Sequence, residues 1–497
     1  MKKIIVLFLL LALCLPLFAG CASSLESGLE EIGTKTEEQK EPEEQETGEI
    51  VYPDTFAVGY ATIDISGTPS EGAPLDYYGG KATGIHDPLL LTCVALWDGE
   101  EVALVMTADL KKMYGNTLFN TSDVAGKSLD IIKNKFKIPA ENVILSCTHS
   151  HSAPDAGENH ASNLRWQQYY YKQLPVVVEN ALRDLDVLDG AYTGKSIMEE
   201  GITFVRRYYL ESGKVKMSPA ASDKPVSHES EADPELRTIR LDRKNKKDVL
   251  LVNFQTHYGN ADKLYPNQLS ADFVTPFRKQ AEEKFDCLFA YYSGASANIG
   301  FSSAIDGERK YSSFLGAVEN AFIPATERAL NTEEKVELAK LQTNRNLYDG
   351  TCMIRSEERV AQAREAGQAG GPSTPEGAAL MKKYNLESEL EIQMTLRHQS
   401  LPETLEVPFT AISFGDIAFC SVPYEMFDTN GKQVRDGSPF KTTFVCTLAG
   451  GALGYVPSEL GYKNGSYETF NCAFVPGSGE EFANEIIRLL NECKSGN

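Results

Sequence analysis

The sequence predicts an α/β protein in which helices flank a large mixed β-sheet. Three observations indicate this fold. Short apolar runs bounded by turn residues recur along the chain, as β-strands do. In two places an apolar run is followed by a helical pattern and then by another apolar run, the order of a strand–helix–strand unit. The 497 residues, 42% of them hydrophobic, supply enough apolar side chains for a large core.

The chain begins with a segment typical of bacterial export. Two lysines precede the almost wholly apolar residues 4–18, and small residues then lead to Cys21. This order resembles a bacterial lipobox, so we expect residues 1–20 to be a lipoprotein signal peptide. Lipid on Cys21 would hold the exported protein at a cell membrane, facing outside the cytoplasm. An uncleaved membrane anchor is the alternative, but the apolar run is shorter than the ~20 residues that a spanning helix needs.

Acidic residues dominate the composition. The 70 Asp and Glu against 48 Lys and Arg give a net charge of −22. This charge would be repelled by phosphate backbones, so we expect no nucleic acid partner. Residues 22–50 alone contain ten Glu and two Lys. Because this stretch is polar and poor in aromatic residues, residues 21–53 are expected to form an acidic, disordered tether.

The remaining residues, 54–497, are expected to form one catalytic domain. The strands predicted in its first half are apolar runs between turn residues: 56–60, 89–97, 102–108, 143–147, 249–254 and 287–292. Helices are predicted at residues 122–136 and 276–285, each between two of these strands.

Residues 331–400 have a different character. The segment is charged, helical in pattern and interrupted at residues 367–375 by Gly, Pro and Ser, which predicts a helical insertion. Beyond it, residues 407–414 and 417–422 predict paired strands, and residues 479–493 a closing helix.

Eight cysteines follow Cys21. Export permits disulfides, but four of the eight lie inside apolar runs, where free buried cysteines are common. No Cys-x-x-Cys spacing occurs, which argues against a cysteine-based zinc site. Pairing among Cys446, Cys472 and Cys493 stays open.

Two of the seven histidines, His149 and His151, follow the predicted strand at residues 143–147. In extended backbone, residues two apart point the same way, so both imidazoles can face one cleft at the carboxyl end of the strand. His257 has the same context after residues 249–254, which favours convergence of all three. A pair of surface or turn histidines is the alternative for His149 and His151.

A catalytic zinc site needs three or four N, O or S ligands, one position being kept for water. A carboxylate would complete the set, and Glu425 follows the predicted strand at residues 417–422; a solvated acid is the alternative. Ser296 lies in a loop of small residues, where a serine could attack a carbonyl if a metal or a base activates it. The segment lacks the second glycine of a Gly-x-Ser-x-Gly nucleophile elbow, so an ordinary serine-containing loop is the alternative.

From about residue 55 to residue 482 the chain resembles the N-terminal catalytic domain of the neutral/alkaline non-lysosomal ceramidase family. The T-H-S-H-S-A-P segment at residues 148–154 is similar to the family's T-H-T-H-S-G-P signature. The other matching segments occur in the family's order and are residues 58–65, 84–89, 107–110, 233–235 and 253–257. Little sequence follows the matching part, so the immunoglobulin-like domain that these ceramidases usually add is not expected.

The resemblance implies a role for each matching residue. The implied ligands of one zinc ion are His149, His257, Glu425 and Tyr455. The implied catalytic residues are Ser296, as nucleophile, and His151, Arg206 and Tyr467, as hydrogen-bond donors near the scissile carbonyl. Arg207 is an alternative to Arg206. Ala295 and Ala297 stand where the family has Asp and Pro.

The expected function is that of a zinc-dependent amidohydrolase. Its substrate would be an N-acyl lipid, N-acylsphingosine or a related small amide, cleaved to a fatty acid and an amine. Zinc would polarise the carbonyl or activate a water or the serine. Two alternatives are a zinc hydrolase of another ester or amide that uses water, and a surface binding protein without catalysis on the same scaffold. The oligomeric state stays open.

Overall fold

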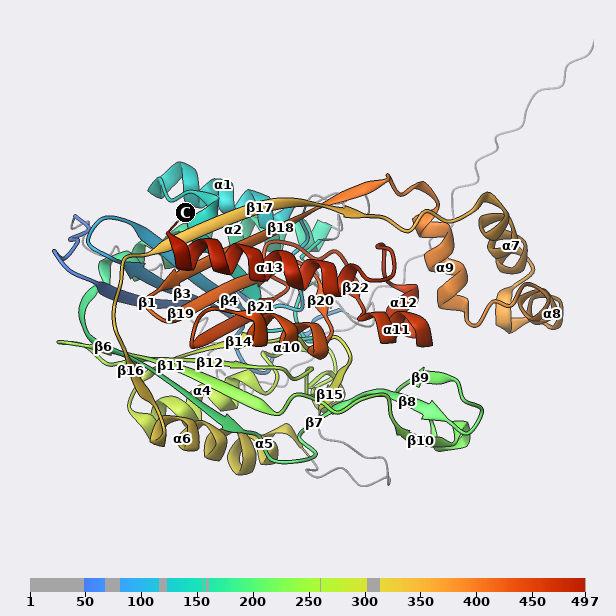
Figure 1. Ribbon diagram of the computed structural model, residues 1–497, viewed down its shortest axis with the longest axis horizontal. Helices are drawn as coiled ribbons and strands as arrows, with labels where there is room; N and C mark the ends of the chain where they lie inside the picture. The colour runs from blue at the N-terminus through green and yellow to red at the C-terminus, as the bar shows by residue number, and fades with distance from the viewer. Residues whose placement is uncertain are drawn as a thin grey trace, which may run out of the picture. The chain divides into compact units, whose positions relative to one another are not determined.

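The computed structural model describes residues 49–67, 81–115, 123–154, 156–157, 161–259, 261–301 and 313–496 (Figure 1). The chain divides into two units, Met1–Glu49 and Ile50–Asn497. The predicted signal peptide, Cys21 and nearly all of the predicted tether lie outside the described residues. Among the helices that are described, none has the length and apolar character needed to cross a membrane.

A mixed sheet of nine strands forms the centre of the larger unit (Figure 1). Eight strands follow one another in the order β14-β12-β11-β6-β1-β3-β4-β5, and β16 pairs with β6. Their bounds are β1 (Ala57–Asp64), β3 (Leu90–Trp97), β4 (Val102–Ala108), β5 (Val143–Cys147), β6 (Asp186–Ile197), β11 (Glu235–Arg243), β12 (Val249–Phe254), β14 (Leu288–Ser293) and β16 (Glu334–Val336). The prediction of a large mixed sheet with flanking helices is confirmed.

Two pairs of neighbouring strands, β4–β5 and β12–β14, are parallel, and the other pairs of this sheet are antiparallel. A parallel pair needs a crossover, and the two predicted helices supply it. Helix α1 (Val124–Phe136) joins β4 to β5, and its first turn is capped by Asp123, whose carboxylate accepts from the Gly126 amide at 2.7 Å. Helix α4 (Val274–Phe285) lies between β12 and β14.

The nine-stranded sheet folds over, so that β14 faces β1 and β4. Two buried tyrosine hydroxyls show this contact. Tyr60 in β1 donates to the Phe289 carbonyl at 2.7 Å, and Tyr292 in β14 donates to the Val105 carbonyl at 3.0 Å. Apolar side chains from both halves fill the space between them in one buried cluster, which includes Val58, Val94 and Leu251.

A second sheet shares this core. Its four strands lie in the order β17-β18-β19-β21, with bounds β17 (Gln342–Thr351), β18 (Thr404–Phe414), β19 (Ile417–Val422) and β21 (Thr442–Thr447). Phe419 and Phe444 pack on Tyr292 of the first sheet, with ring centroids 6.3 and 6.2 Å away. The predicted hairpin of β18 and β19 and the closing helix α13 (Ser478–Ser495) are both present.

The prediction of a helical insertion at residues 331–400 is wrong for its first part. β17 is an edge strand that pairs with β18 along its whole length, from Gln342↔Ser413 to Thr351↔Thr404. Its polar side chains, which suggested a helix, suit an edge strand because charge there discourages pairing with another chain. The helical prediction is right for α7 (Glu357–Gln368), α8 (Pro375–Tyr384) and α9 (Glu389–Arg397), which surround a small core of their own.

Several shorter elements surround the sheets. Two small sheets matter for the site: β7 (Thr203–Val205) pairs with β15 (Ile299–Phe301), and β20 (Glu425–Met426) pairs with β22 (Tyr455–Val456). The other strands are β2 (Gly84–Ile85), β8 (Arg207–Leu210), β9 (Val215–Met217), β10 (Pro225–His228) and β13 (Gln268–Leu269). The other helices are α2 (Ala161–Arg183), α3 (Ala261–Leu264), α5 (Phe314–Ala317), α6 (Ile323–Asn331), α10 (Asp428–Gly437), α11 (Glu459–Asn464) and α12 (Tyr467–Phe470).

All eight cysteines of the described part of the chain are buried and free. Cys446, Cys472 and Cys493, whose pairing the sequence left open, therefore form no disulfide with one another.

Candidate metal centre and active site

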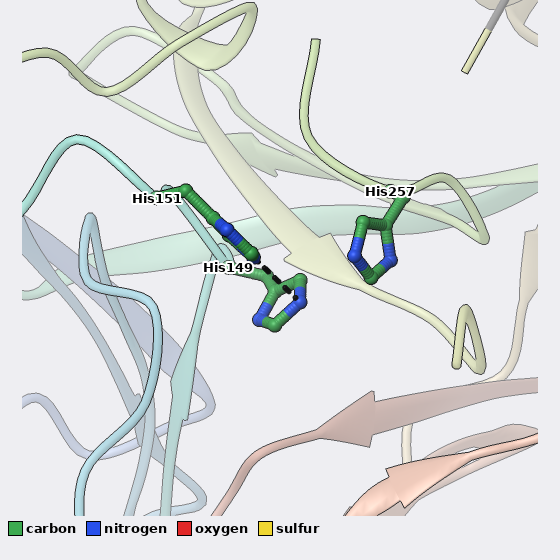
Figure 2. A group of neighbouring side chains, drawn as sticks. All are labelled: His149, His151 and His257. Atoms are coloured by element: carbon green, nitrogen blue, oxygen red, sulfur yellow. Dashed lines mark hydrogen bonds between the residues drawn. The ribbon is translucent and has the colours of Figure 1, made fainter. Parts of the chain in front are cut away.

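Three buried histidines, His149, His151 and His257, lie together (Figure 2). One ring nitrogen of each lies within 4.8 Å of the corresponding atoms of the other two. The Nε2 atoms of His149 and His151 are 3.3 Å apart, and the rings of His149 and His257 have centroids 4.6 Å apart. The convergence that the sequence favoured is confirmed.

The H-x-H pair reaches the centre through a turn rather than an extended strand. The chain leaves β5 beside the end of β4, where the Thr148 amide donates to the Ala108 carbonyl and the His149 amide to the Leu110 carbonyl, both at 2.9 Å. His149 then has a φ of 68°, in the left-handed region that a residue with a side chain rarely adopts. The expectation of extended backbone was wrong, and the two imidazoles lie edge to face at 88°.

Hydrogen bonds fasten this turn to a neighbouring loop. The Ser150 hydroxyl donates to the Ser270 carbonyl at 2.6 Å, and the Ser270 amide donates to the Ser152 carbonyl at 2.9 Å. The Ser270 hydroxyl in turn donates to the Asp87 carboxylate at 2.6 Å. Asp87, which belongs to one of the family-like segments, thus supports the histidine turn from outside the centre.

Backbone carbonyls orient the imidazoles of His149 and His257. Nδ1 of His149 lies 3.0 Å from the Lys111 carbonyl, and Nδ1 of His257 lies 3.2 Å from the Ser296 carbonyl. A carbonyl can only accept, so each Nδ1 carries the proton and each Nε2 presents a lone pair. Nε2 of His151 then donates to Nε2 of His149. An Nδ1–H held by a carbonyl is the usual arrangement of a metal-binding histidine.

Glu425 and Tyr455 join the centre from the β20–β22 pair, in which they are directly opposite partners. Glu425 Oε2 is 3.6 Å from His149 Nε2. It is buried and has no hydrogen-bond partner among the residues that the structure describes. An orphaned carboxylate oxygen facing an imidazole lone pair fits a shared cation, because Zn–N and Zn–O bonds of about 2.0–2.2 Å place tetrahedral ligands roughly 3.3–3.6 Å apart.

The protonation of these groups also suits a metal. Burial is the main cause that lowers the pKa of all three histidines, so they are neutral at pH 7, as ligands must be. Burial and the neighbouring Glu425 raise the pKa of Tyr455 well above its usual value. As a ligand, Tyr455 would have to lose its proton to the charge of the ion. The imidazole and carboxylate set fits zinc.

Arg206 spans the centre. Its Nη1 donates to His257 Nε2 at 3.1 Å, its Nη2 to the Tyr455 hydroxyl at 3.3 Å, and its Nε to the Glu468 carboxylate at 3.2 Å. Burial alone would lower its pKa, but Tyr455 and Glu468 raise it, so the guanidinium stays charged.

Arg207, the alternative to Arg206, has a different position. Its side chain is fully buried and bonds to the carboxylates of Glu229 and Glu468, at 2.6 and 2.7 Å. Arg206 lines a cavity beside the histidines, whereas Arg207 is not among the described residues of its lining. Arg206 is therefore the arginine that can meet a substrate.

A cavity of about 750 Å³ opens beside the histidines. Six residues singled out in the sequence line it: His151, Arg206, His257, Glu425, Tyr455 and Tyr467. The Tyr467 ring packs edge to face on Tyr455, with centroids 5.5 Å apart. The other two predicted site residues, His149 and Ser296, are not among the described residues that line the cavity. His149 belongs to the histidine cluster.

Ser296 contacts the histidine cluster through its backbone. It lies in the loop between β14 and β15, it is 6% exposed, and it approaches the centre through its carbonyl, which faces His257. Its neighbour Ala297 is held by the Met426 carbonyl at 3.0 Å. Ser296 is absent from the described lining of the cavity.

Glu468 and Tyr258 are site residues that sequence reasoning missed. Glu468 is fully buried between Arg206 and Arg207 and fixes the direction of both guanidinium groups. Its position directly after Tyr467 was the available signal. The Tyr258 ring stacks on His151 at 3.7 Å between centroids, and its position directly after His257 was the corresponding signal.

No family model and no curated protein matches the sequence. Solved structures that share its fold include two ceramidases. The neutral ceramidase from Pseudomonas aeruginosa matches with a TM-score of 0.65 and 14% identity, over 90% of this chain and 75% of that chain. A ceramidase complexed with C2 matches with a TM-score of 0.64 and 15% identity, over 89% and 76%. The chain therefore has a neutral ceramidase-like fold, and the resemblance seen in the sequence is confirmed for the fold.

The lowered pKa values of the histidines predict that acid destabilises the protein once metal has been removed with a chelator. Below about 6.5, the usual histidine pKa, the unfolded chain binds protons that the buried imidazoles resist. The free energy of unfolding, measured by urea titration, should therefore fall as the pH drops from 7.5 towards 5. The double variant His151→Gln, His257→Gln should show a shallower fall, and an equal fall in both proteins would refute this origin.

Proposed function

We propose that the chain is a zinc-dependent amidohydrolase that cleaves an N-acyl lipid, N-acylsphingosine or a related N-acyl amide, to a fatty acid and an amine. One observation carries the proposal: neutral imidazoles, a carboxylate with an orphaned oxygen and a charged arginine meet at one large cavity. The ceramidase-like fold supports the amide as the bond that is cleaved.

His149, His257 and Glu425 would hold the ion, with Tyr455 as a fourth ligand. When bound, zinc would polarise the amide carbonyl and lower the pKa of a water or hydroxyl nucleophile. Arg206 donates to His257 Nε2, and a metal would need the lone pair of the same nitrogen. The guanidinium must therefore turn away from His257 when His257 binds a metal. The bond to Glu468 keeps its Nε anchored during this change.

Three donors on the cavity wall can stabilise the oxygen of the scissile carbonyl as it gains negative charge. They are Arg206, the Nε2–H of His151 and the Tyr467 hydroxyl. Burial and Glu425 raise the pKa of Tyr467, so it keeps its proton for donation at neutral pH. Donors of this kind in a dry site typically contribute about 3–4 kcal/mol each to the transition state.

Apolar side chains on another part of the wall offer a place for the acyl chain. Phe204 in β7 and Ile299 and Phe301 in β15 lie on paired strands and line the cavity beside Tyr208 and Met217. Burying an acyl chain there would stabilise the complex by roughly 0.8 kcal/mol per methylene.

A metal analysis tests the zinc centre. The purified protein should contain about one zinc per chain and hydrolyse N-acyl amides. His149→Ala should lose the metal and at least about 100-fold of the activity, because it removes a ligand. His86→Ala is a matched control, since His86 is more than a third exposed and lies outside the histidine cluster. Full zinc occupancy in His149→Ala would refute the centre, and zinc without hydrolysis of any amide would favour a binding protein on this scaffold.

The nucleophile is either the Ser296 hydroxyl or a water. The water route is the second candidate, and the position of Ser296 outside the described cavity lining favours it. Ser296→Ala distinguishes the two. If the serine attacks, turnover should fall by about 1,000-fold or more while the zinc content stays the same. Unchanged turnover would leave water as the nucleophile.

The predicted lipid on Cys21 would place the enzyme at a membrane, where an N-acyl lipid is found. Expressed in a bacterium, the chain should partition into the detergent phase of a phase-separating extract. Cys21→Ala should move it to the aqueous phase, because one apolar anchor is lost. A protein that stays in the detergent phase after this change would be held by another segment.

A further inference from the structure

The loop at residues 296–298 contacts two functional residues of the candidate centre through its backbone. The Ser296 carbonyl accepts a hydrogen bond from His257 Nδ1 at 3.2 Å. The Asn298 carbonyl accepts one from the Arg206 amide at 2.8 Å. The position of this loop therefore affects both the ring of a proposed metal ligand and the backbone from which the substrate-facing arginine extends.

The same loop is joined to the strand that carries Glu425. The Ala297 amide donates to the Met426 carbonyl at 3.0 Å, and Met426 follows Glu425 in β20. A shift of the loop would therefore change the separation between His257 and Glu425, the two proposed ligands that it connects. In a metal site, small changes in the separation of ligands matter because the bonds to the ion have narrow lengths.

Two side chains, Asn298 and Asp428, hold this loop in place. Both are fully buried, at 1% exposure. Asn298 Nδ2 donates to Asp428 Oδ1 at 2.6 Å, and Asn298 Oδ1 accepts from the Asp428 amide at 2.9 Å. Because the asparagine uses both its donor and its acceptor on the same partner, the pair fixes the direction of the loop as well as its distance from α10.

Asp428 also connects the loop to residues 233–235, a family-like segment that the proposed chemistry does not use. Asp428 Oδ2 accepts from the Asp233 amide at 3.3 Å. The Asp233 carbonyl in turn accepts from Gln255 Nε2 at 2.5 Å, and Gln255 lies two residues before His257. The network thus returns to the segment that carries the histidine whose ring the loop contacts.

The charge of Asp428 strengthens this network. Burial raises the pKa of Asp428 to about 6, and the hydrogen bond from Asn298 opposes that rise, so the group is a carboxylate at neutral pH. Hydrogen bonds to a carboxylate are shorter and stronger than those to a neutral oxygen. Stability of the fold alone is the alternative role for such a pair, although buried charges are a weak source of stability.

We propose that Asn298 and Asp428 are positioning residues of the metal centre. They hold residues 296–298 so that the Ser296 carbonyl fixes the imidazole of His257 through its Nδ1–H, as the partners of metal-binding histidines do. This inference rests on the proposed function, in which His257 is a ligand. It applies to either nucleophile, because the loop acts here through its backbone.

An exchange of the two side chains tests the proposal. Asp428→Asn leaves one acceptor oxygen for two donors, Asn298 Nδ2 and the Asp233 amide. Asn298→Asp places two carboxylates against each other, where they repel. The double variant Asn298→Asp, Asp428→Asn restores every bond. The new amide donates to the new carboxylate and accepts from the Asp233 amide, and the new carboxylate accepts from the backbone amide of residue 428.

The first measurement is zinc affinity, by competition with a chelator. It should be about 10–100-fold weaker in each single variant and close to the wild-type value in the double variant. If a single variant does not fold, Asn298→Ala takes its place, because it removes the amide without adding a charge. Wild-type affinity in the single variants, or a folded double variant that stays as weak as they are, would overturn the proposal.

Asp186→Asn is a matched control for these variants. Asp186 is buried and accepts from both the backbone amide and Nδ2 of Asn245, at 2.6 and 2.9 Å, so this change also leaves one acceptor for two donors. It lies outside the histidine cluster and the described lining of the cavity. Zinc affinity should therefore stay at the wild-type value. A loss equal to that in Asp428→Asn would assign the effect to stability and overturn the proposal.

The second measurement separates this inference from the proposed function. In metal-free protein labelled with 15N in its seven histidines, the Nδ1–H of His257 should give an NMR signal protected from solvent exchange. We expect this signal to disappear in the single variants and to return in the double variant. The Nδ1–H of His149 is an internal control, since it donates to the Lys111 carbonyl and should persist throughout.

This measurement requires neither zinc nor hydrolysis. If the wild type binds no zinc or cleaves no amide, the proposed function fails, and the same NMR pattern would still support the positioning of His257. A His257 signal that is unchanged in the single variants would overturn the inference even in a protein that hydrolyses amides.

Discussion

The functional centre depends on the folding over of the nine-stranded sheet. His149 follows β5 and His257 follows β12, and five antiparallel steps in the strand order make these two strands run in opposite directions. In a flat sheet their carboxyl ends would lie at opposite edges. Strand twist accumulates across a wide sheet, and the buried cluster between the two halves holds them face to face. The apolar core therefore determines which histidines meet.

Electrostatics then divides the centre into a neutral and a charged part. Burial keeps the three imidazoles neutral, whereas Arg206 and Arg207 stay charged because they share the fully buried Glu468. Removing one partner from such a buried group leaves an uncompensated charge, which costs about 3–5 kcal/mol. The same carboxylate fixes one arginine towards the cavity and the other within the protein. Glu468 thus links the stability of this region to the direction of the guanidinium that can meet a substrate.

Local patterns in the sequence were sufficient for the strands and helices of the first sheet, because a buried strand needs a continuous apolar run wherever it lies. They failed for β17, whose polar residues suit an edge strand as well as a helix. The ligand candidates were found because each follows a strand or matches a family-like segment. Arg206 and Arg207 are adjacent in the sequence. Only the folded arrangement of β7 and β8 decides that the first lines the cavity and that the second is buried against Glu229 and Glu468. The role of Glu468 depends on a contact across 262 residues, which no local pattern contains.

One wall of the cavity comes from a segment with its own core. Met394 and Arg397 of α9 line the cavity with His398, while α7, α8 and α9 pack around Ala363, Met381 and Ile392 (Figure 1). The residues of the proposed centre lie in other parts of the chain: His149, His151, His257, Glu425 and Arg206. Sequence change in the α7–α9 segment can therefore alter the shape and charge of the entrance while the reaction centre is preserved. Because the two parts are separate, proteins of this kind can evolve towards new substrates while every evolutionary step keeps the same reaction centre.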